Sequence, residues 1–387
     1  MNAPTEEFAL NAAQRAEVIA GLNQILPAHA VLHEVEDTKP YECDGLSLFR
    51  QLPMVVALPE TEAQVIDILK LANRLNVPVV ARGAGTGLSG GAQPHKNGIL
   101  LGMAKFNKIL KVDVQSRSAV VQPGVRNLAI SEAVAQHQLY YAPDPSSQIA
   151  CTIGGNVAEN SGGVHCLKYG LTVHNVLKVR AITIEGEIVE FGSEAPDAPG
   201  LELMNLVIGS EGMLAVVTEV TVKLVPKPAL AQVIMASFDD VANAGNAVAA
   251  VIAAGIIPAG LEMMDKRATQ MVEPFVKAGY DTEAEAILLL ESDGTIEEVA
   301  EEIAEMTRVL NGCGATAIKV SQSEAERLKF WAGRKNAFPA AGRVSPDYYC
   351  MDGTIPRRSL AHVLNAITEM EKKYDMRCAN VFHAGDG

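Results

Sequence analysis

The sequence is poor in basic residues. Its 387 residues include 32 Lys and Arg against 46 Asp and Glu, which gives a formal net charge of −14. Proteins that bind nucleic acid usually carry a basic surface, and an anionic membrane repels a chain of this charge. The charge balance therefore argues against nucleic acid and membrane surfaces as partners and favours chemistry on a small molecule.

Cysteines are few and widely separated. They form no C-x-x-C pair and no ferredoxin-like spacing, so an iron–sulfur cluster on this chain is not expected. We expect reduced cysteines that pack as small hydrophobic side chains. The six are Cys43, Cys151, Cys166, Cys313, Cys350 and Cys378.

Long apolar runs are also missing. The most apolar stretch, residues 247–261, is interrupted by Gly255 and Pro258 and is shorter than the ~20 residues that cross a bilayer. The amino-terminal residues include Glu6 and Glu7 and lack the positive and apolar regions of a secretory signal. We therefore expect a cytoplasmic protein without a transmembrane helix.

The length and the 48% hydrophobic content favour two domains. No internal repeat or low-complexity tract is present. The composition changes at V-P-K-P-A, residues 225–229, where two prolines favour a boundary. We predict a helical segment over residues 1–50, a first domain over 51–227 and a second domain over 228–387.

The first domain has the pattern of short strands separated by glycine-rich turns. Thr61 and Gln64 predict a capping box that opens a helix. The apolar stripe of this helix consists of Val65, Ile68, Leu69, Ala72 and Leu75. The predicted strands cover residues 54–58, 78–82, 111–114, 118–123, 179–184 and 213–225.

The second domain alternates longer helices with strands. Thr295 and Glu298 predict a second capping box. The predicted helices cover residues 241–254, 296–310, 323–337 and 359–374, and the predicted strands cover 286–291, 315–320, 348–356 and 378–384. This order predicts helices packed on one face of an antiparallel sheet.

The strongest local pattern is R-G-A-G-T-G-L-S-G-G, residues 82–91, directly after a predicted strand. Residues with little or no side chain allow successive backbone N–H groups to converge on an anion such as a pyrophosphate. The loop contains a G-x-G-x-x-G string, but a Rossmann domain needs a helix here, and the strand-like residues 99–102 follow instead. A glycine-rich connection without a ligand is the alternative.

Two further glycine-rich segments precede the predicted boundary. One is P-D-P-S-S-Q-I-A-C-T-I-G-G-N-V-A-E-N-S-G-G over residues 143–163, and the other is I-G-S-E-G over residues 208–212. Together with the first loop and Y-G-L-T at residues 169–172, they resemble the FAD-binding domain of vanillyl-alcohol-oxidase (PCMH) type flavoproteins. The chain is most similar to the flavin subunit of glycolate oxidase and the related D-lactate dehydrogenases, over residues 41–387.

The resemblance implies an α+β fold, in which a PCMH-type FAD-binding domain of two subdomains precedes a ferredoxin-like α+β cap domain. It also implies FAD as the cofactor. The pyrophosphate would contact Arg82, Gly83, Ala84, Gly85, Thr86, Gly87 and Leu88. The ribityl and isoalloxazine parts would contact Asp144, Thr152, Gly154, Gly155, Asn160, Gly162 and Gly163, and the adenine side Glu211 and Gly212. Relatives with covalent flavin have a histidine where this sequence has Thr86, so non-covalent FAD is expected.

Oxidation of a C2 alcohol beside a carboxylate needs a cation, a path for the hydroxyl proton and a hydride acceptor, which the flavin supplies. Arg334 lies in F-W-A-G-R-K, residues 330–335, and matches the W-x-x-R pattern of the cap domain in the resembled family. Its planar guanidinium can bind a carboxylate through two hydrogen bonds. Arg334 is the predicted catalytic cation, and a solvated or salt-bridged arginine is the alternative.

The chain ends on N-V-F-H-A-G-D-G, residues 380–387. In the resembled enzymes this string continues to further metal ligands, so the resemblance implies that His383 is catalytic and is the first ligand of a divalent metal, Zn or Mn. Such a site needs about three protein ligands. We therefore expect that the cap domain is C-terminally truncated and that the remaining ligands lie beyond the chain end. A buried strand histidine is the alternative.

Relatives that act on dicarboxylates have a lysine near the position of Cys350, which favours a monocarboxylate here unless Arg343 or Arg357 replaces that cation. The predicted function is FAD-dependent oxidation of glycolate or D-lactate to the 2-oxo acid. Electrons would pass to an iron–sulfur subunit, a quinone or a similar carrier, in the cytoplasm or at the inner membrane through partner subunits. The alternatives are a non-catalytic FAD-binding subunit and a nicotinamide-linked dehydrogenase.

Overall fold

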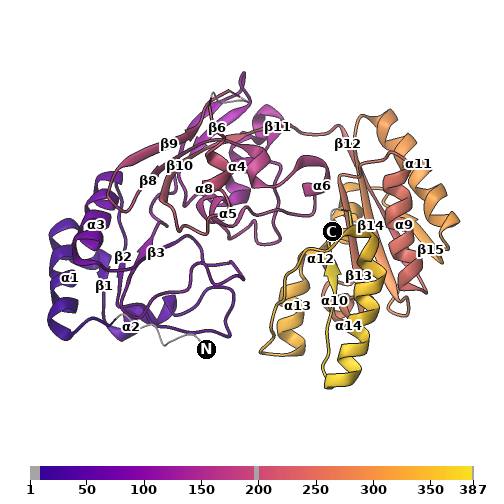
Figure 1. Ribbon diagram of the computed structural model, residues 1–387. Helices are drawn as coiled ribbons and strands as arrows, with labels where there is room; N and C mark the ends of the chain where they lie inside the picture. Colours follow the sequence, from indigo (N-terminus) through magenta and orange to yellow (C-terminus); the bar gives the residue numbers. More distant parts are fainter. Residues whose placement is uncertain (1–8, 196–199, 386–387) are drawn as a thin grey trace. The chain divides into compact units, whose positions relative to one another are not determined.

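The computed structural model describes residues 9–195 and 200–385 (Figure 1). The chain forms two compact units. Unit 1 comprises Met1–Ser161 and Leu171–Pro226, and unit 2 comprises Gly162–Gly170 and Lys227–Gly387. A short segment from the middle of the glycine-rich sequence is therefore built into the second unit. The predicted domain limits at residues 50 and 227 stay predictions.

The first sheet of unit 1 has the strand order β1-β2-β4-β3, in which β2, β4 and β3 are parallel and β1 is antiparallel. The strands are β1 (Val31–Leu32), β2 (Val55–Ala57), β3 (Val79–Arg82) and β4 (Ile99–Gly102), and the helices are α1 (Ala12–Ile25), α2 (Val35–Thr38) and α3 (Glu62–Leu75). Thr61 and Gln64 form the predicted capping box of α3. The predicted stripe of α3 packs into the core of this sheet, with its first four residues fully buried.

The second sheet of unit 1 is antiparallel, with the order β5-β6-β10-β8-β9. Its strands are β5 (Ile109–Asp113), β6 (Ser118–Val121), β8 (Val176–Ile182), β9 (Ile188–Gly192) and β10 (Val216–Lys223), and β7 (Leu139–Tyr140) pairs separately with β11 (Val225–Pro226). Its core also contains residues of α4 (Asn127–Val134), α5 (Ile153–Glu159) and α8 (Met204–Val207), and α7 (Thr172–Asn175) precedes β8. Two sheets in one unit agree with the predicted two-subdomain domain.

The sheet of unit 2 is antiparallel, with the order β15-β12-β14-β13-β16. Its strands are β12 (Leu230–Phe238), β13 (Gly260–Asp265), β14 (Ala286–Gly294), β15 (Ala317–Val320) and β16 (Val381–Phe382). The succession β12-α9-β13-β14-α11-β15 is the ferredoxin-like βαββαβ order, with α10 inserted before β14. The predicted ferredoxin-like domain is confirmed.

Helices cover both faces of this sheet, so the prediction of one covered face was wrong. One core contains residues of α9 (Val241–Ala253), α11 (Ile296–Gly312) and α14 (Leu360–Tyr374), and the other contains residues of α10 (Lys266–Val276), α12 (Glu324–Lys335) and α13 (Ala337–Val344). The reason lies in β12 and β14, which have consecutive apolar residues. Ile234 and Met235, for example, are both buried but in different cores. A strand that is apolar on both faces needs a cover on each.

The predicted strand over residues 348–356 is absent. These residues form an extended, mostly exposed loop that leads to a 3-10 turn at Arg357–Ser359. Gly353 weakens strand pairing, and Pro356 has no N–H to donate to a ladder. The edge beside β13 is taken by β16, which is shorter than the predicted strand over residues 378–384.

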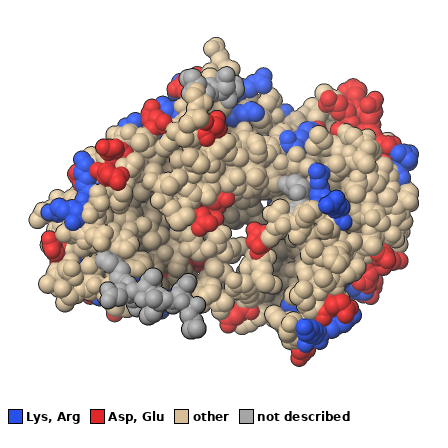
Figure 2. Space-filling view, in the orientation of Figure 1, with Lys and Arg blue, Asp and Glu red and all other residues tan. Residues whose placement is uncertain are grey.

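Charged side chains of both signs are interspersed on the face shown in Figure 2. Lys and Arg form separate small groups there, with Asp and Glu nearby, and no continuous basic area covers this face.

Candidate active site

The first glycine-rich loop leads from β3 to β4 without a helix, as predicted. Gly85 has a φ of +69°, and a Cβ at this position would collide with the guanidinium of Arg82. Arg82 itself is buried, and its Nη1 donates to the carbonyl of Ala92 at 3.5 Å. Burial lowers the pKa of Arg82, and the charge of Asp44 acts in the opposite direction. The loop is thus folded closely over a buried cation.

The second glycine-rich segment lies against this loop. A Cβ at Gly83 would collide with Oγ1 of Thr152 and would lie 3.9 Å from the N atom of Gly155. Oγ1 of Thr152 is buried and has no hydrogen-bond partner among the described residues. A buried hydroxyl without a partner beside a glycine loop fits a site for a ligand that supplies the missing bond.

The third segment approaches the same loop. The N–H of Glu211 donates to the carbonyl of Ala158 at 2.8 Å, which holds the segment at the end of α5. A Cβ at Gly91 would lie 2.8 Å from Oε1 of Glu159 and 3.5 Å from Oε2 of Glu211. Burial and the charge of Glu211 raise the pKa of Glu159. All three glycine-rich segments of unit 1 therefore converge, and their residues fit a dinucleotide such as FAD.

Some predicted cofactor residues have a packing role of their own. A Cβ at Gly154 would lie 2.5 Å from Cβ of Pro123, and Oδ1 of Asn160 accepts a hydrogen bond from the N–H of Val173 at 3.0 Å. Asp144 is buried. The remaining loop residues, Ala84, Thr86, Gly87, Leu88 and Gly212, are at least partly exposed. Gly162 and Gly163 belong to unit 2.

In unit 2 the structure brings together the two predicted catalytic residues. Arg334 lies on α12 and His383 directly follows β16, and Nη2 of Arg334 is 3.2 Å from Nε2 of His383. Both contact Glu262 of β13. The Glu262 carboxylate accepts from Nε of Arg334 at 2.6 Å and from Nδ1 of His383 at 2.6 Å. Its relative exposure is 1%, so a guanidinium and an imidazole hold a carboxylate inside the unit.

These contacts fix the tautomer of His383. A carboxylate only accepts hydrogen bonds and a guanidinium only donates them. Nδ1 therefore carries the proton that is donated to Glu262, and Nε2 accepts from Arg334. The imidazole is neutral in this arrangement, and its side chain is 41% exposed. The cluster thus presents a histidine nitrogen lone pair next to a guanidinium.

A second buried carboxylate, Glu291 of β14, lies among three donors. It accepts from Nε2 of His165 at 3.1 Å, from Nη1 of Arg327 at 2.8 Å, and from Nε1 of Trp331. Burial by itself raises the pKa of Glu291, but the hydrogen bond and charge of His165 and the charge of Arg327 outweigh it and hold the pKa at about 2. Glu291 is therefore ionised at neutral pH.

The segment 162–170 is anchored to the same strand a second time. Asp293 accepts from Nζ of Lys168 at 2.5 Å and from the hydroxyl of Tyr169 at 2.6 Å. The segment contains α6 (Cys166–Tyr169), in which Sγ of Cys166 donates to the carbonyl of Gly163 at 2.8 Å. His165 is thus one of the contacts that hold the segment on β14.

The described residues do not contain a complete set of ligands for the predicted metal. Residues 9–195 and 200–385 contain no group of three or more His, Cys, Asp or Glu side chains that could hold a metal ion. His383 as a metal ligand stays a prediction, and no step of the reaction is assigned to a metal.

Sequence reasoning missed Glu262 and Glu291. Each is the one acidic residue of an otherwise apolar run, G-L-E-M-M over residues 260–264 and A-I-L-L-L-E over residues 286–291. Because a buried carboxylate needs donors, this pattern could have marked both as partners of buried cations. Which cations they bind depends on contacts across the sheet.

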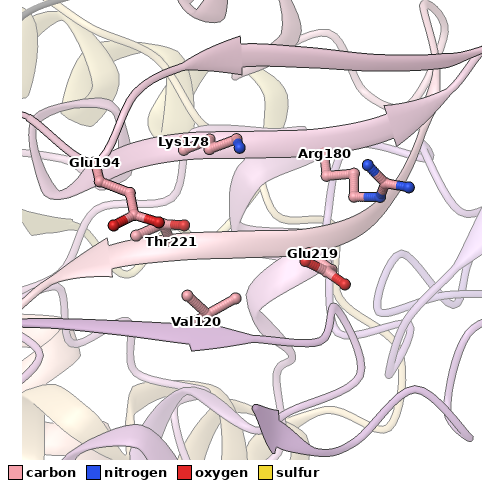
Figure 3. A pocket seen from close by; sticks show the side chains of 6 residues that line it. All are labelled: Val120, Lys178, Arg180, Glu194, Glu219 and Thr221. Atoms are coloured by element: carbon pink, nitrogen blue, oxygen red, sulfur yellow. The ribbon is translucent and has the colours of Figure 1, made fainter. Parts of the chain in front are cut away.

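A hollow on the second sheet of unit 1 is a weaker candidate (Figure 3). It is lined by Val120, Lys178, Arg180, Glu194, Glu219 and Thr221, which lie mostly on the neighbouring strands β6, β8 and β10. Arg180 is bound by Glu62 at 2.9 and 3.0 Å and by Glu190 at 3.1 Å, and Lys178 by Glu190 at 2.9 Å. Its cations are thus already paired, and the hollow is not a candidate for anion binding.

Comparisons with known proteins match both units. The family model for an FAD binding domain matches residues 53–192, and that for the C-terminal domain of FAD linked oxidases matches residues 227–387. Glycolate oxidase subunit GlcD of Escherichia coli is 59% identical, with 98% of this chain and 76% of the relative covered. A D-lactate dehydrogenase of Anaerostipes hadrus is 30% identical, with 96% of this chain and 80% of the relative covered.

Solved structures support the fold. The 4-ethylphenol oxidase of Gulosibacter chungangensis matches with a TM-score of 0.81 at 16% identity. The match covers 98% of this chain and 82% of the oxidase chain. The resemblance stated from the motifs is thereby confirmed. The chain belongs to the FAD-linked oxidases, in the family that contains glycolate oxidase subunit GlcD and related D-lactate dehydrogenases.

Proposed function

We propose that the chain oxidises glycolate or D-lactate to the 2-oxo acid, with Arg334 as the cation for the substrate carboxylate and His383 as the group nearest the hydroxyl. Membership of the family makes the protein an FAD-dependent oxidoreductase of 2-hydroxy acids. The observation that carries the proposal is the contact of Arg334 with His383 and their shared carboxylate, Glu262.

FAD, when bound, supplies the hydride acceptor. We propose that it binds without a covalent bond, because Thr86 stands where covalent relatives have histidine. The fit rests on the loop folded over Arg82 and on the buried hydroxyl of Thr152 without a partner in the described chain. The backbone N–H groups of the loop would bind the pyrophosphate, and Arg82 would balance its charge.

The residues of unit 2 have complementary tasks in this proposal. Glu262 holds Nε of Arg334, so the Nη groups are those that can donate to a substrate carboxylate. His383 has its Nδ1 proton directed to Glu262, so Nε2 can accept the proton of the substrate hydroxyl once Nη2 of Arg334 donates to the substrate carboxylate and no longer to Nε2. Glu262 would then stabilise the imidazolium that forms, because it lies 2.6 Å from Nδ1.

The preference for a monocarboxylate remains part of the proposal. Of the two arginines that could serve a second carboxylate, Arg343 lies over the ring of Phe275 with its Cζ 4.4 Å from the centroid. Arg357 donates to the carbonyl of Gly385 at 3.1 Å. Both arginines already have a partner inside the unit, which supports a substrate with one carboxylate.

Electron transfer to a partner is also proposed. The Escherichia coli and Bacillus subtilis relatives are named as subunits of glycolate oxidase, which supports partner subunits as electron acceptors. None of the described helices is long and apolar enough to cross a membrane. An inner-membrane association through such partners and a cytoplasmic location both stay predictions.

The decisive experiment is anaerobic reduction of the flavin. We expect glycolate or D-lactate to bleach the flavin absorbance of the wild-type protein. Arg334→Ala should raise KM and lower kcat/KM by about 100-fold or more, since a buried charge-assisted contact to the substrate is lost. Arg308→Ala is the matched control, because Arg308 is an exposed arginine paired with Glu305.

Each rival function has its own outcome. A protein that keeps FAD but is not reduced by either acid would be the non-catalytic subunit. Release of NAD in place of FAD on denaturation would show a nicotinamide-linked enzyme. Unchanged kinetics in Arg334→Ala would remove Arg334 from the site.

A further inference from the structure

We propose that Asp44 is a further FAD-binding residue, whose Oδ2 accepts a hydrogen bond from a hydroxyl group of the cofactor. Asp44 precedes the region that matches the FAD binding domain model, residues 53–192. The inference rests on the proposed binding of FAD by the glycine-rich loop.

Asp44 is a buried carboxylate with one oxygen unused. Its relative exposure is 6%. Oδ1 accepts a hydrogen bond from the N–H of Leu46 at 2.9 Å, whereas Oδ2 is buried and has no partner among the described residues. Leaving a charged oxygen buried and unpaired is costly, so a donor from outside the chain is the expected partner.

The segment that carries Asp44 lies against the glycine-rich loop. A Cβ at Gly45, the next residue, would lie 2.7 Å from the carbonyl oxygen of Gly87 and 2.8 Å from that of Thr86. The ring of Tyr41 lies 5.8 Å from Cζ of Arg82. This stretch therefore forms one wall of the loop, outside the part of the chain that carries the glycine-rich motifs.

Electrostatic effects place the carboxylate near the loop as well. The charge of Asp44 works against the burial that lowers the pKa of Arg82. It also adds to the burial and the Glu211 charge that raise the pKa of Glu159. Asp44 is thus close to groups on two of the glycine-rich segments.

The chemistry of the cofactor selects the partner. A pyrophosphate has no hydrogen to donate at neutral pH and is repelled by a carboxylate. In FAD, however, a ribityl chain and a ribose flank the pyrophosphate, and both carry hydroxyl groups. A carboxylate oxygen at the wall of a phosphate-binding loop is therefore suited to a cofactor hydroxyl, and Arg82 remains the cation for the phosphates.

The variant Asp44→Asn distinguishes the roles of the two carboxylate oxygens. Asparagine keeps an oxygen for the N–H of Leu46 and places an NH2 group where Oδ2 was, so the charge-assisted bond from a cofactor hydroxyl to the carboxylate is lost and only a weaker neutral bond, in which the hydroxyl accepts, can replace it. We expect the apoprotein of this variant to be as stable as the wild type, and its Kd for FAD to rise about tenfold or more. Apoprotein would be titrated with FAD by flavin absorbance, and the Tm would be measured without FAD. Asp37→Asn, an exposed carboxylate of the same segment, is the control.

The outcomes are distinct. An unchanged Kd, or a lower apoprotein Tm with an unchanged Kd, would overturn the inference and leave a structural role. If Asp44→Asn has no added effect in an Arg82→Met background, Asp44 acts only through Arg82 and the direct bond is refuted. Asp44→Ser, which keeps one oxygen for Leu46, replaces the asparagine variant if that does not fold. A wild-type apoprotein that does not bind FAD would refute the proposed function itself.

Discussion

Two buried carboxylates, Glu262 and Glu291, organise the donors of unit 2. Glu262 binds the two residues predicted to be catalytic, whereas Glu291 binds a histidine, an arginine and a tryptophan that hold the unit together. In the proposed function, the same residue type thus has a functional role in one strand and a structural role in the neighbouring strand. The roles of Glu262 and Glu291 differ because the two carboxylates bind different partners.

Glu291→Gln should make the stability of unit 2 less dependent on pH. The folded pKa of Glu291 is about 2, below its ordinary value of 4.5. Its ionisation therefore stabilises the fold fully above about pH 4.5, and this contribution is lost as the pH falls towards 2. We expect the variant to be about 3 kcal/mol less stable at pH 7, with a difference that shrinks below about pH 5.

The pH dependence of this stability difference is measured by urea unfolding at several pH values between 3 and 7, with circular dichroism as the signal. Glu297→Gln, an exposed position, is the control. A difference that does not vary with pH would show that Glu291 is not the ionised group the cluster requires.

Gly85→Val should reduce FAD occupancy. A Cβ at this position would collide with the Arg82 guanidinium, and the φ of +69° disfavours any branched side chain. We expect purified protein with little bound flavin, measured as the ratio of flavin to protein absorbance. Gly312→Val, where no atom lies within 4 Å of the new Cβ, is the control. A normally yellow variant would contradict the assignment of the loop.

At the scale of elements, the segment 162–170 is the least expected feature. It begins with the last two glycines of the glycine-rich run 143–163 and ends before Leu171, yet it packs on β14 of unit 2. Its chain neighbours on both sides belong to unit 1. Gly162 and Gly163, which were predicted to contact flavin, thus lie in a segment held by residues of unit 2.

Asp293→Ala should release this segment. Tyr169 would lose its acceptor and Lys168 would keep only the backbone carbonyl of residue 293, so Lys168 would become more available to trypsin. We expect cleavage after Lys168 to become about tenfold faster, because about 1.4 kcal/mol of local opening energy corresponds to a factor of ten. Mass spectrometry of a short digest measures the cleavage. Glu297→Ala is the control, and an unchanged rate would show that Asp293 does not hold the segment.

At the scale of the whole molecule, each unit has its own cores. The clusters around the two sheets of unit 1 and around the two faces of the unit 2 sheet share no residue. The only tryptophan of the chain, Trp331, is buried in unit 2 and lies far along the sequence from the glycine-rich loop. It is therefore a reporter for one unit.

FAD should stabilise the two units unequally. FAD at about 100 times its Kd adds ~2.7 kcal/mol to the free energy of unfolding of the part that binds it. We expect the urea midpoint from Trp331 fluorescence to move less than the midpoint of flavin release when FAD is added. Coincident midpoints at every FAD concentration would show that the units unfold as one.

The sequence by itself determined the family, the cofactor and most elements, because these depend on local patterns. The glycine-rich loops, the capping boxes of α3 and α11 and the apolar strand runs are readable within a few residues. The exceptions include the false strand over residues 348–356 and the unpredicted β9, β12, β13, α10 and α13. Apolar runs flanked by prolines or glycines do not reveal by themselves which segment will find a strand partner.

Only the tertiary structure decided how the sites are assembled. Glu262 meets His383 across 121 residues of sequence, and His165 meets Glu291 across 126. Neither spacing carries a local signal. The second covered face of the unit 2 sheet and the place of Asp44 beside the glycine-rich loop have the same cause. Sheet pairing and side-chain packing bring distant residues together, and a buried charge takes whichever partners that packing supplies.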